Sequence, residues 1–331
     1  MRKDKSYTMY QTLKNFGKAK IQEPLCKHTT FKIGGPADFF VTVEKIDKLQ
    51  ELLAFLDGEG QEYFILGGGS NMLARDEGFR GVVIEVKDKT IEQEGDEMIA
   101  CAGAVTVEVA QQSMKGGLTG FEWGVGVPGT IGGAVRGNAG AMGSEMKDNV
   151  KKVLLYKDGS LHEYDNDACG FEYRSSIFKR EGGIILKVWL KLKKGENIEG
   201  KKKMLEFLRY RNTTQPQGYA STGCIFKNVE FNETVPKGAY NRKKLLEHFD
   251  KENEKVQQFL SVGKISAGWL VQEAGCKGYQ VGQAQVSEKH GNFIINLGGA
   301  TSHDVLKIIE MVKEKVYNTY GIELEEEIQI V

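Results

Sequence analysis

Three kinds of side chain that could take part in acid–base or ionic chemistry stand in distinctive local contexts. Arg174 lies among aromatic residues in FEYRSSIFK, where a guanidinium suits a two-pronged contact with a carboxylate. Cys224 follows a glycine in ASTGCIFKN, and three consecutive glutamates, 325–327, lie in the terminal LEEEIQIV. Each also has an ordinary interpretation: a surface arginine paired with a glutamate, a small buried cysteine, and the solvated face of a strand. The pattern alone does not choose among the three glutamates.

The first of two glycine-rich stretches, GGGSN, directly follows the expected strand YFIL. Consecutive glycines expose backbone N–H groups to an anion such as a pyrophosphate, and this interpretation competes with a tight turn after the strand. No Gly-Lys-Ser/Thr follows, so the stretch is not a Walker A loop. The candidate cofactor-binding residues here are Gly67, Gly68, Gly69, Ser70 and Asn71.

The second stretch, residues 124–143, contains a literal G-x-G-x-x-G. We reject it as a dinucleotide-binding fingerprint because no buried strand precedes it and Pro128 stands where the helix should begin. We expect instead an extended glycine loop that lies against a flat ligand, or a glycine-rich packing segment. The candidate cofactor-binding residues here are Pro128, Gly129, Thr130, Gly132 and Gly133.

Composition excludes several other classes of protein. Forty-five basic and 45 acidic residues leave no net charge, so neither nucleic acid nor an anionic membrane is an expected partner. No apolar run approaches the roughly 18 residues of a membrane span, and residues 1–20 lack the apolar core of a secretory signal. Five cysteines without a CxxC pair indicate neither a disulfide framework nor a zinc site, and the histidines show no ligand spacing. We therefore expect no metal, and a cytoplasmic protein with reduced thiols.

Hydrophobic periodicity predicts a mixed α+β fold behind these candidates. A βαβ-like unit closes near residue 86: strand ADFFVTV, a helix from residue 46 with five apolar residues on one face, then strands YFIL and GVVIEV. Four further strands (MIACAG, KKVLLYKDG, GSLHEYD, GIILKVWLKLKKG), a helix over 105–114 and a charged helix ending near QPQGY follow. Beyond them we expect a strand at GCIFKN, a helix at AGWLVQEAG and a strand at NFIINL. A helix capped by Thr301 and Asp304 and a terminal strand complete the chain.

Length alone predicts two domains, or one domain with a smaller appendage. The boundaries between the expected elements divide the chain further, into four consecutive parts. They are an N-terminal tail (1–20), two subdomains (21–86 and 87–214) and a C-terminal domain (215–331).

Taken together, eight ordered segments resemble the UDP-N-acetylenolpyruvoylglucosamine reductase family. They are HTTFKIGGPADFF, ILGGGSNMLARD, GVPGTIGGAVRGNAGAMG, FEYRSSIFK, GCIFKN, SAGWLVQEAGCKG, AQVSEKHGNFIIN and LEEEI. The resemblance implies a two-part FAD-binding domain of the PCMH or vanillyl-alcohol-oxidase type, followed by a C-terminal α/β substrate-binding domain. It also implies NADPH as co-substrate, a UDP-sugar as substrate and a role in peptidoglycan precursor synthesis. Both glycine stretches would then bind FAD, which we expect to be non-covalent because neither contains His or Cys. We expect a monomer or a weak homo-oligomer.

The resemblance also assigns roles to single residues. Arg174 matches the arginine of the family's YR-S motif, and Glu327 matches the second glutamate of its terminal LE-x-E. Cys224 stands where the family usually has a serine that gives a proton to C2 of the substrate. Lys227 and Asn228 resemble positions that contact substrate.

Two further departures and two competing functions stay open at this stage. Only 50 positions separate Arg174 from Cys224, which indicates the family branch that lacks a substrate loop, and residues 229–263 match no expected segment. An FAD oxidase that uses O₂ is one competing function, against which the Arg, Cys and Glu set and FKN argue. The other is a flavin-binding protein that lost catalysis, although a thiol still carries a transferable proton.

Overall fold

The structure is a computed structural model that describes residues 2–195, 197–231 and 246–331. Two compact units divide the chain: the first contains residues 1–28, 35–70 and 77–213, and the second contains 29–34, 71–76 and 214–331. The units are thus built from interleaved segments. The division into four consecutive parts, which is finer than these two units, stays a prediction.

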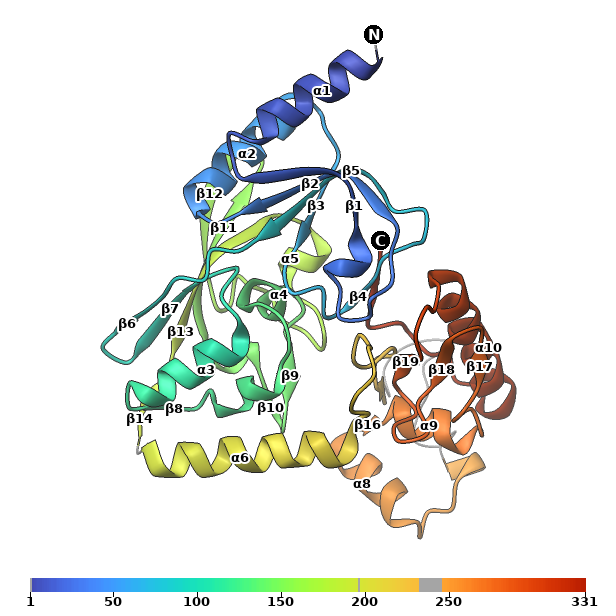
Figure 1. The fold of residues 1–331 in the computed structure, drawn as a ribbon. Helices are drawn as coiled ribbons and strands as arrows, with labels where there is room; N and C mark the ends of the chain where they lie inside the picture. Colours follow the sequence, from blue (N-terminus) through green and yellow to red (C-terminus); the bar gives the residue numbers. More distant parts are fainter. Residues whose placement is uncertain (1, 196, 232–245) are drawn as a thin grey trace. The chain divides into compact units, whose positions relative to one another are not determined.

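The first sheet of the first unit confirms the predicted βαβ arrangement. Strands β2 (Pro36–Val43) and β3 (Tyr63–Leu66) both run parallel to β5 (Phe79–Val86). Helix α2 (Ile46–Gly58) connects β2 to β3 and covers a face of the sheet (Figure 1). Its predicted apolar face is entirely buried and comprises Ile46, Leu49, Leu52, Leu53 and Leu56.

The polar N-terminus contains a helix and an edge strand. Helix α1 (Arg2–Leu13) leads to strand β1 (Lys18–Pro24), which pairs antiparallel with β2 at the edge of the sheet. Leu13 is fully buried in the core of this sheet. An edge strand pairs on one side only and exposes its other side to solvent, so it can be polar. A polar strand gives no hydrophobic periodicity, and the sequence pattern therefore does not predict it.

The second sheet of the first unit is antiparallel, in the order β12-β11-β13-β7-β6, and it confirms the four strands predicted there. Its strands are β6 (Ile91–Glu94), β7 (Glu97–Cys101), β11 (Val150–Lys157), β12 (Ser160–Asp165) and β13 (Ile184–Lys191). The predicted helices are present as α3 (Thr106–Lys115) and α6 (Asn197–Thr214). Shorter elements of the unit are η1 (Leu25–Lys27), β8 (Leu118–Thr119), η2 (Glu122–Gly126), β9 (Gly140–Ala141), β10 (Ser144–Glu145), η3 (Met146–Asp148), α5 (Ile177–Arg180) and β14 (Lys193–Lys194).

The second glycine stretch is not the extended loop that its composition predicts. Helix α4 (Ile131–Arg136) begins inside it, capped by Thr130, whose hydroxyl accepts a hydrogen bond from the Gly133 N–H at 3.4 Å. Pro128 precedes the cap, where a missing N–H removes no helical hydrogen bond, so it does not prevent the helix from starting. Burial of Ile131 and Val135 then stabilises a helix that is poor in propensity.

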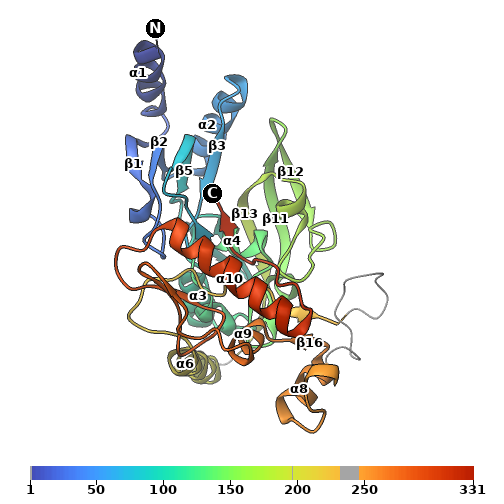
Figure 2. The same cartoon turned by 90° about the vertical axis from the view of Figure 1, so that its right-hand side faces the viewer.

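In the described residues of the second unit, helices pack with a small antiparallel sheet, β17-β18-β19. Helix α10 (Ser302–Tyr320) contacts β17 (Gln280–Val281) and β18 (Ala284–Val286), and Figure 2 shows it as one unbroken helix. Its capping box between Thr301 and Asp304 is present as predicted. The other elements are β4 (Met72–Leu73), β15 (Val229–Glu230), α8 (Glu254–Val262), β16 (Lys264–Ile265), α9 (Ala267–Glu273), β19 (Ile294–Asn296) and β20 (Gln329–Ile330).

Two predicted strands of this unit are wrong in extent. GCIFKN forms only single bridges, from Cys224 to Phe293 and from Phe226 to Glu326. Gly223 (φ +80°) bends the chain at the start of this segment. The Asn292 side chain, rather than a strand, accepts the hydrogen bond of the Phe226 N–H. In the terminal segment, Glu326 forms the bridge to Phe226 and only β20 is a strand, which pairs parallel with β4.

The segment 229–263 matched no expected motif, and residues 232–245 of it lie outside the described residues. Its described part packs on α9: the ring centroids of Phe249 and Phe259 lie 4.5 and 5.1 Å from that of Trp269. Among the helices of the described ranges, none has the length and apolar character needed to span a bilayer.

Candidate active site

The two glycine stretches contact each other inside the first unit. A Cβ on Gly68 would lie 2.7 Å from the Cα of Gly129, and one on Gly67 would lie 2.5 Å from Oγ1 of Thr130. Side chains at these positions would separate the loops, so close packing alone requires glycine at both. The structure therefore brings together residues that the sequence placed in one site from positions about 60 apart.

Further contacts fix the conformation of these loops. The Ser70 hydroxyl donates a hydrogen bond to the Pro128 carbonyl at 3.1 Å. Gly69 and Gly129 have φ of +58° and +101°, which L side chains rarely adopt. Gly132 packs against Ala102, whose Cβ would lie 2.8 Å from an added Cβ. Two backbone turns without bulky side chains are thus held side by side, which is a surface that a flat dinucleotide can approach closely.

Asn71, predicted to bind the cofactor, makes hydrogen bonds within the second unit. Its side-chain amide donates to the main-chain carbonyl of Glu327 at 3.3 Å, and its main-chain carbonyl accepts from the Gln329 N–H at 3.0 Å. The adjoining strands β4 and β20 continue this pairing. Two residues predicted to serve different functions are therefore direct partners.

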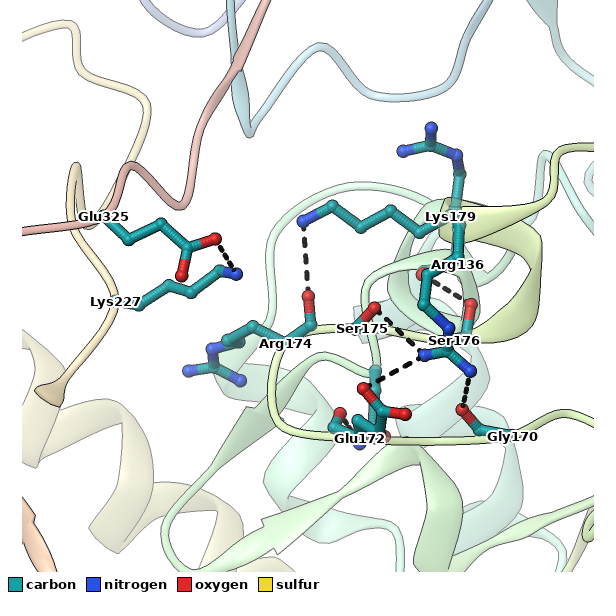
Figure 3. A network of polar contacts seen from close by, with 11 residues as sticks. Arg136, Gly170, Glu172, Arg174, Ser175, Ser176, Lys179, Lys227 and Glu325 are labelled. Atoms are coloured by element: carbon teal, nitrogen blue, oxygen red, sulfur yellow. Dashed lines mark hydrogen bonds and ion pairs between the residues drawn. The ribbon is translucent and has the colours of Figure 1, made fainter. Parts of the chain in front are cut away.

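Arg174 lies in the turn of a very tight hairpin. Glu172 and Ser175 exchange both backbone hydrogen bonds, at 3.0 and 3.1 Å, and Arg174 has φ of +53°. The Lys179 ammonium donates to the Arg174 carbonyl at 3.2 Å (Figure 3). A positive φ in a residue that is neither glycine nor asparagine is uncommon and marks functional positions more often than others.

Residues that the sequence analysis missed hold this hairpin in place (Figure 3). The Arg180 guanidinium contacts the Glu172 carboxylate at 3.3 Å and donates to the Gly170 carbonyl at 2.9 Å. The buried Asn138 amide donates to the Glu172 carbonyl at 2.9 Å. The Ser176 hydroxyl donates to the Arg136 carbonyl at 2.7 Å and so ties the hairpin to α4. The only local signal for Asn138 is its position in GNAG, since asparagine tolerates the positive φ (+42°) found there.

In the second unit, the segment that carries Cys224 lies between two others. On one side, the Ile225 N–H donates to the Asn292 carbonyl at 2.9 Å. On the other, the Glu327 N–H donates to the Ile225 carbonyl at 2.7 Å, and the Lys227 N–H donates to the Glu325 carbonyl at 2.9 Å. Cys224 and Glu327 therefore lie on adjacent hydrogen-bonded segments. Cys224 is half-buried, and none of the described cysteines forms a disulfide.

The two residues predicted to contact substrate have structural partners in the same unit. The Lys227 ammonium forms an ion pair with the Glu325 carboxylate (Figure 3). The Asn228 side-chain oxygen accepts from the Ala267 N–H at 3.1 Å, at the start of α9.

The three terminal glutamates differ: Glu325 is exposed, Glu326 forms a 2.8 Å ion pair with Lys313, and Glu327 is half-buried.

Arg174 belongs to the first unit, and Cys224 and Glu327 belong to the second. The described part of the chain nowhere gathers three His, Cys, Asp or Glu side chains as a metal ion would require.

Comparisons with known proteins match both parts of the chain. Residues 37–164 match the FAD binding domain family, and residues 215–331 match the family of the UDP-N-acetylenolpyruvoylglucosamine reductase C-terminal domain. Proteins named UDP-N-acetylenolpyruvoylglucosamine reductase from Caldanaerobacter subterraneus subsp. tengcongensis and Bacillus subtilis are 41% and 36% identical to the chain. Each alignment covers 95% of the chain and 94% of the relative.

A solved structure agrees with these matches. The crystal structure of the Thermus caldophilus UDP-N-acetylenolpyruvylglucosamine reductase has a TM-score of 0.72 and 34% identity, covering 95% of the chain and 98% of its own length. These findings confirm the resemblance, the fold class and the FAD that the sequence predicted.

Proposed function

The chain belongs to the UDP-N-acetylenolpyruvoylglucosamine reductase family, and on this premise we propose that it is an FAD-dependent UDP-N-acetylmuramate dehydrogenase. It reduces UDP-N-acetylglucosamine enolpyruvate to UDP-N-acetylmuramate with NADPH, in peptidoglycan precursor synthesis. The observation that carries this proposal is the 41% identity that extends over 95% of the chain. The proposal includes a cytoplasmic enzyme that acts as a monomer or a weak homo-oligomer.

The two packed glycine loops fit an FAD. Residues 67–70 and 128–133 lie within the FAD binding domain match, and their contact through Gly68 and Gly129 leaves backbone rather than side chains for the cofactor to approach. When bound, the flavin carries a hydride from NADPH to C3 of the enolpyruvyl group. The chain supplies position, charge and a proton.

Arg174 is the proposed anchor of the substrate carboxylate. Hydride addition at C3 places negative charge on C2 and on the attached carboxylate. A guanidinium stabilises this charge through two parallel hydrogen bonds, provided that its position is fixed in advance. The tight hairpin and its ties to Lys179 and Arg180 support such a fixed position.

Glu327 and Cys224 are the proposed acid groups. A protonated Glu327 carboxyl would donate a hydrogen bond to the same developing charge. Cys224 would transfer its thiol proton to C2, which forms the C–H bond and leaves a thiolate that solvent reprotonates. The bond between the Glu327 N–H and the Ile225 carbonyl supports the idea that the two groups act at one place. Lys227 and Asn228 are proposed substrate contacts.

Spectroscopy of the purified protein tests this proposal. We expect a yellow protein whose colour is released by acid precipitation, bleached by NADPH and restored without oxygen by UDP-N-acetylglucosamine enolpyruvate. Recovery of colour with O₂ but not with this substrate would favour the oxidase alternative. A protein that binds FAD but is not bleached by NADPH would favour the inactive one.

A further inference from the structure

Asn292 holds the backbone that follows Cys224. Its side-chain amide donates to the Phe226 carbonyl at 2.8 Å, and its side-chain oxygen accepts from the Phe226 N–H at 2.8 Å. Its main-chain carbonyl also accepts from the Ile225 N–H at 2.9 Å. One residue thus satisfies three backbone groups within two positions of Cys224.

These bonds also reach Glu327. The Ile225 carbonyl accepts the Glu327 N–H at 2.7 Å, so residues 225–226 lie directly between Asn292 and the segment of Glu327. Because Phe226 presents both a donor and an acceptor, only one orientation of the Asn292 amide satisfies both. The carboxamide therefore sets the register of this backbone as a strand partner would, at a place where no regular strand forms.

Asn292 is itself rigidly held. It is 3% exposed, and its N–H donates to Nδ1 of His290 at 3.1 Å. The Phe293 N–H donates to the His290 carbonyl at 3.0 Å, and the Ser287 hydroxyl accepts from the His290 N–H at 3.4 Å. This tight turn gives the side chain a fixed base, and a buried amide that is hydrogen-bonded through both its oxygen and its nitrogen tolerates little displacement.

We propose that Asn292 is a positioning residue for the reduction step: it places the Cys224 thiol and Glu327 in register with each other through the backbone of Ile225 and Phe226. This inference rests on the proposed function. Displacement of a reacting group by about 1 Å is enough to cost about 100-fold in rate.

Asn296 offers a matched control on the same segment. It is also buried, and its side chain makes three hydrogen bonds to backbone, one more than the side chain of Asn292: to the Phe31 carbonyl (3.0 Å), and from the N–H groups of Gly298 (2.9 Å) and Ala300 (3.1 Å). None of these partners belongs to segments 223–228 or 324–328. Asn292→Ala thus removes two side-chain hydrogen bonds and Asn296→Ala removes three, and the two variants differ in which backbone segments those bonds hold.

The test measures each half-reaction by anaerobic stopped-flow, well below the unfolding midpoint of both variants. We expect Asn292→Ala to keep its FAD and its rate of flavin reduction by NADPH, but to lose about 100-fold in substrate-driven reoxidation at saturating substrate. The solvent isotope effect on reoxidation should rise, because proton delivery becomes limiting. Asn296→Ala should lose thermal stability to a similar extent and stay within threefold of wild type in both steps.

A second measurement does not depend on turnover. Alkylation of Cys224 by iodoacetamide, followed by peptide mass spectrometry, should change in rate by threefold or more in Asn292→Ala and stay unchanged in Asn296→Ala. If Asn292→Ala does not accumulate as folded protein, Asn292→Asp, which keeps an acceptor for Phe226 but not the donor, replaces it in both measurements.

The outcomes separate this inference from the proposed function. Equal reoxidation and alkylation rates in the Asn292 and Asn296 variants would overturn the positioning role. Wild-type protein that reduces its flavin with NADPH but does not react with UDP-N-acetylglucosamine enolpyruvate would overturn the proposed function instead.

Discussion

The side-chain amide of Asn71 donates a hydrogen bond to the main-chain carbonyl of Glu327, at 3.3 Å. Asn71 directly follows the glycine loop proposed to bind FAD, and Glu327 is the proposed acid of the second unit. The chain thus continues from the proposed cofactor loop directly into a contact that helps to hold the segment of the proposed acid.

Asn71→Ala tests which of these connections matters. Loss of one neutral hydrogen bond, worth about 0.5–1.5 kcal/mol, should slow substrate-driven reoxidation about 2- to 10-fold and leave FAD affinity and reduction by NADPH nearly unchanged. Flavin titration and stopped-flow of both half-reactions measure this. A loss of FAD affinity with equal slowing of both steps would instead support the cofactor contact predicted from the sequence.

Gly68→Ala should disrupt the contact between the glycine loops. The new Cβ would lie 2.7 Å from the Gly129 Cα, so one loop must shift, at a cost of about 1–3 kcal/mol. We expect a lower thermal midpoint and a lower FAD content in the purified protein. Gly58→Ala, at the end of α2, is the control, because no atom lies within 4 Å of its added Cβ. Normal FAD content and stability in Gly68→Ala would show that the loops are not held by this contact.

Arg174→Lys should be more harmful than a conservative change. Lysine keeps the charge but loses the planar fork that matches a carboxylate. Reduction of the flavin by NADPH should stay near normal while substrate-driven reoxidation falls at least about 100-fold, the usual loss for one stabilising donor. Arg209→Lys, on the exposed face of α6, is the matched control. Equal losses in both half-reactions would assign Arg174 to folding or flavin binding.

Cys224 stands where the family resemblance leads us to expect a serine. Cys224→Ser keeps a transferable proton and should retain substantial turnover. Cys224→Ala should keep reduction by NADPH but lose substrate-driven reoxidation by about 100-fold or more. Alkylation should inactivate the wild type, and bound substrate should protect it.

Cys26→Ala is the control for this series, since Cys26 is also half-buried. An alanine variant at 224 that reoxidises its flavin at the wild-type rate would falsify the proton-donor role. The residue would then be a small buried hydrophobe.

The protonation of His290 should make the free energy of unfolding depend on pH in the acidic range. Burial, with the charge of Lys277 as the next cause, lowers the pKa of this imidazole. The unfolded chain, whose histidines titrate near pH 6.5, therefore binds more protons below that pH than the folded protein does. The free energy of unfolding should fall as the pH decreases through this range, by at most about 1.4 kcal/mol per pH unit from this residue.

Urea unfolding between pH 7.5 and 5 checks this prediction. His290→Asn, which removes the titrating group, should be less stable at pH 7.5 and show a shallower decrease. An identical pH slope in wild type and variant would contradict the assignment.

Sequence patterns of consecutive residues predicted much of this fold correctly. The spacing of Leu49, Leu52, Leu53 and Leu56 predicts α2, and the capping box at Thr301 predicts where α10 begins, because both signals are complete within a few turns of helix. The glycine stretches and the segments around Arg174 and Cys224 could be singled out for the same reason: their composition is unusual in itself.

Contacts between distant segments decided the rest. The bonds of Asn292 to Phe226 join positions 66 apart, and the bond of Asn71 to Glu327 joins positions 256 apart. Neither leaves a periodic signal, because an amide that replaces a strand partner resembles any other buried asparagine in the sequence. Helix α4 likewise forms among glycines of poor propensity because tertiary burial of Ile131 and Val135 outweighs local preference. The positive φ of Arg174 depends on the closing bonds between Glu172 and Ser175, so only the folded hairpin determines it.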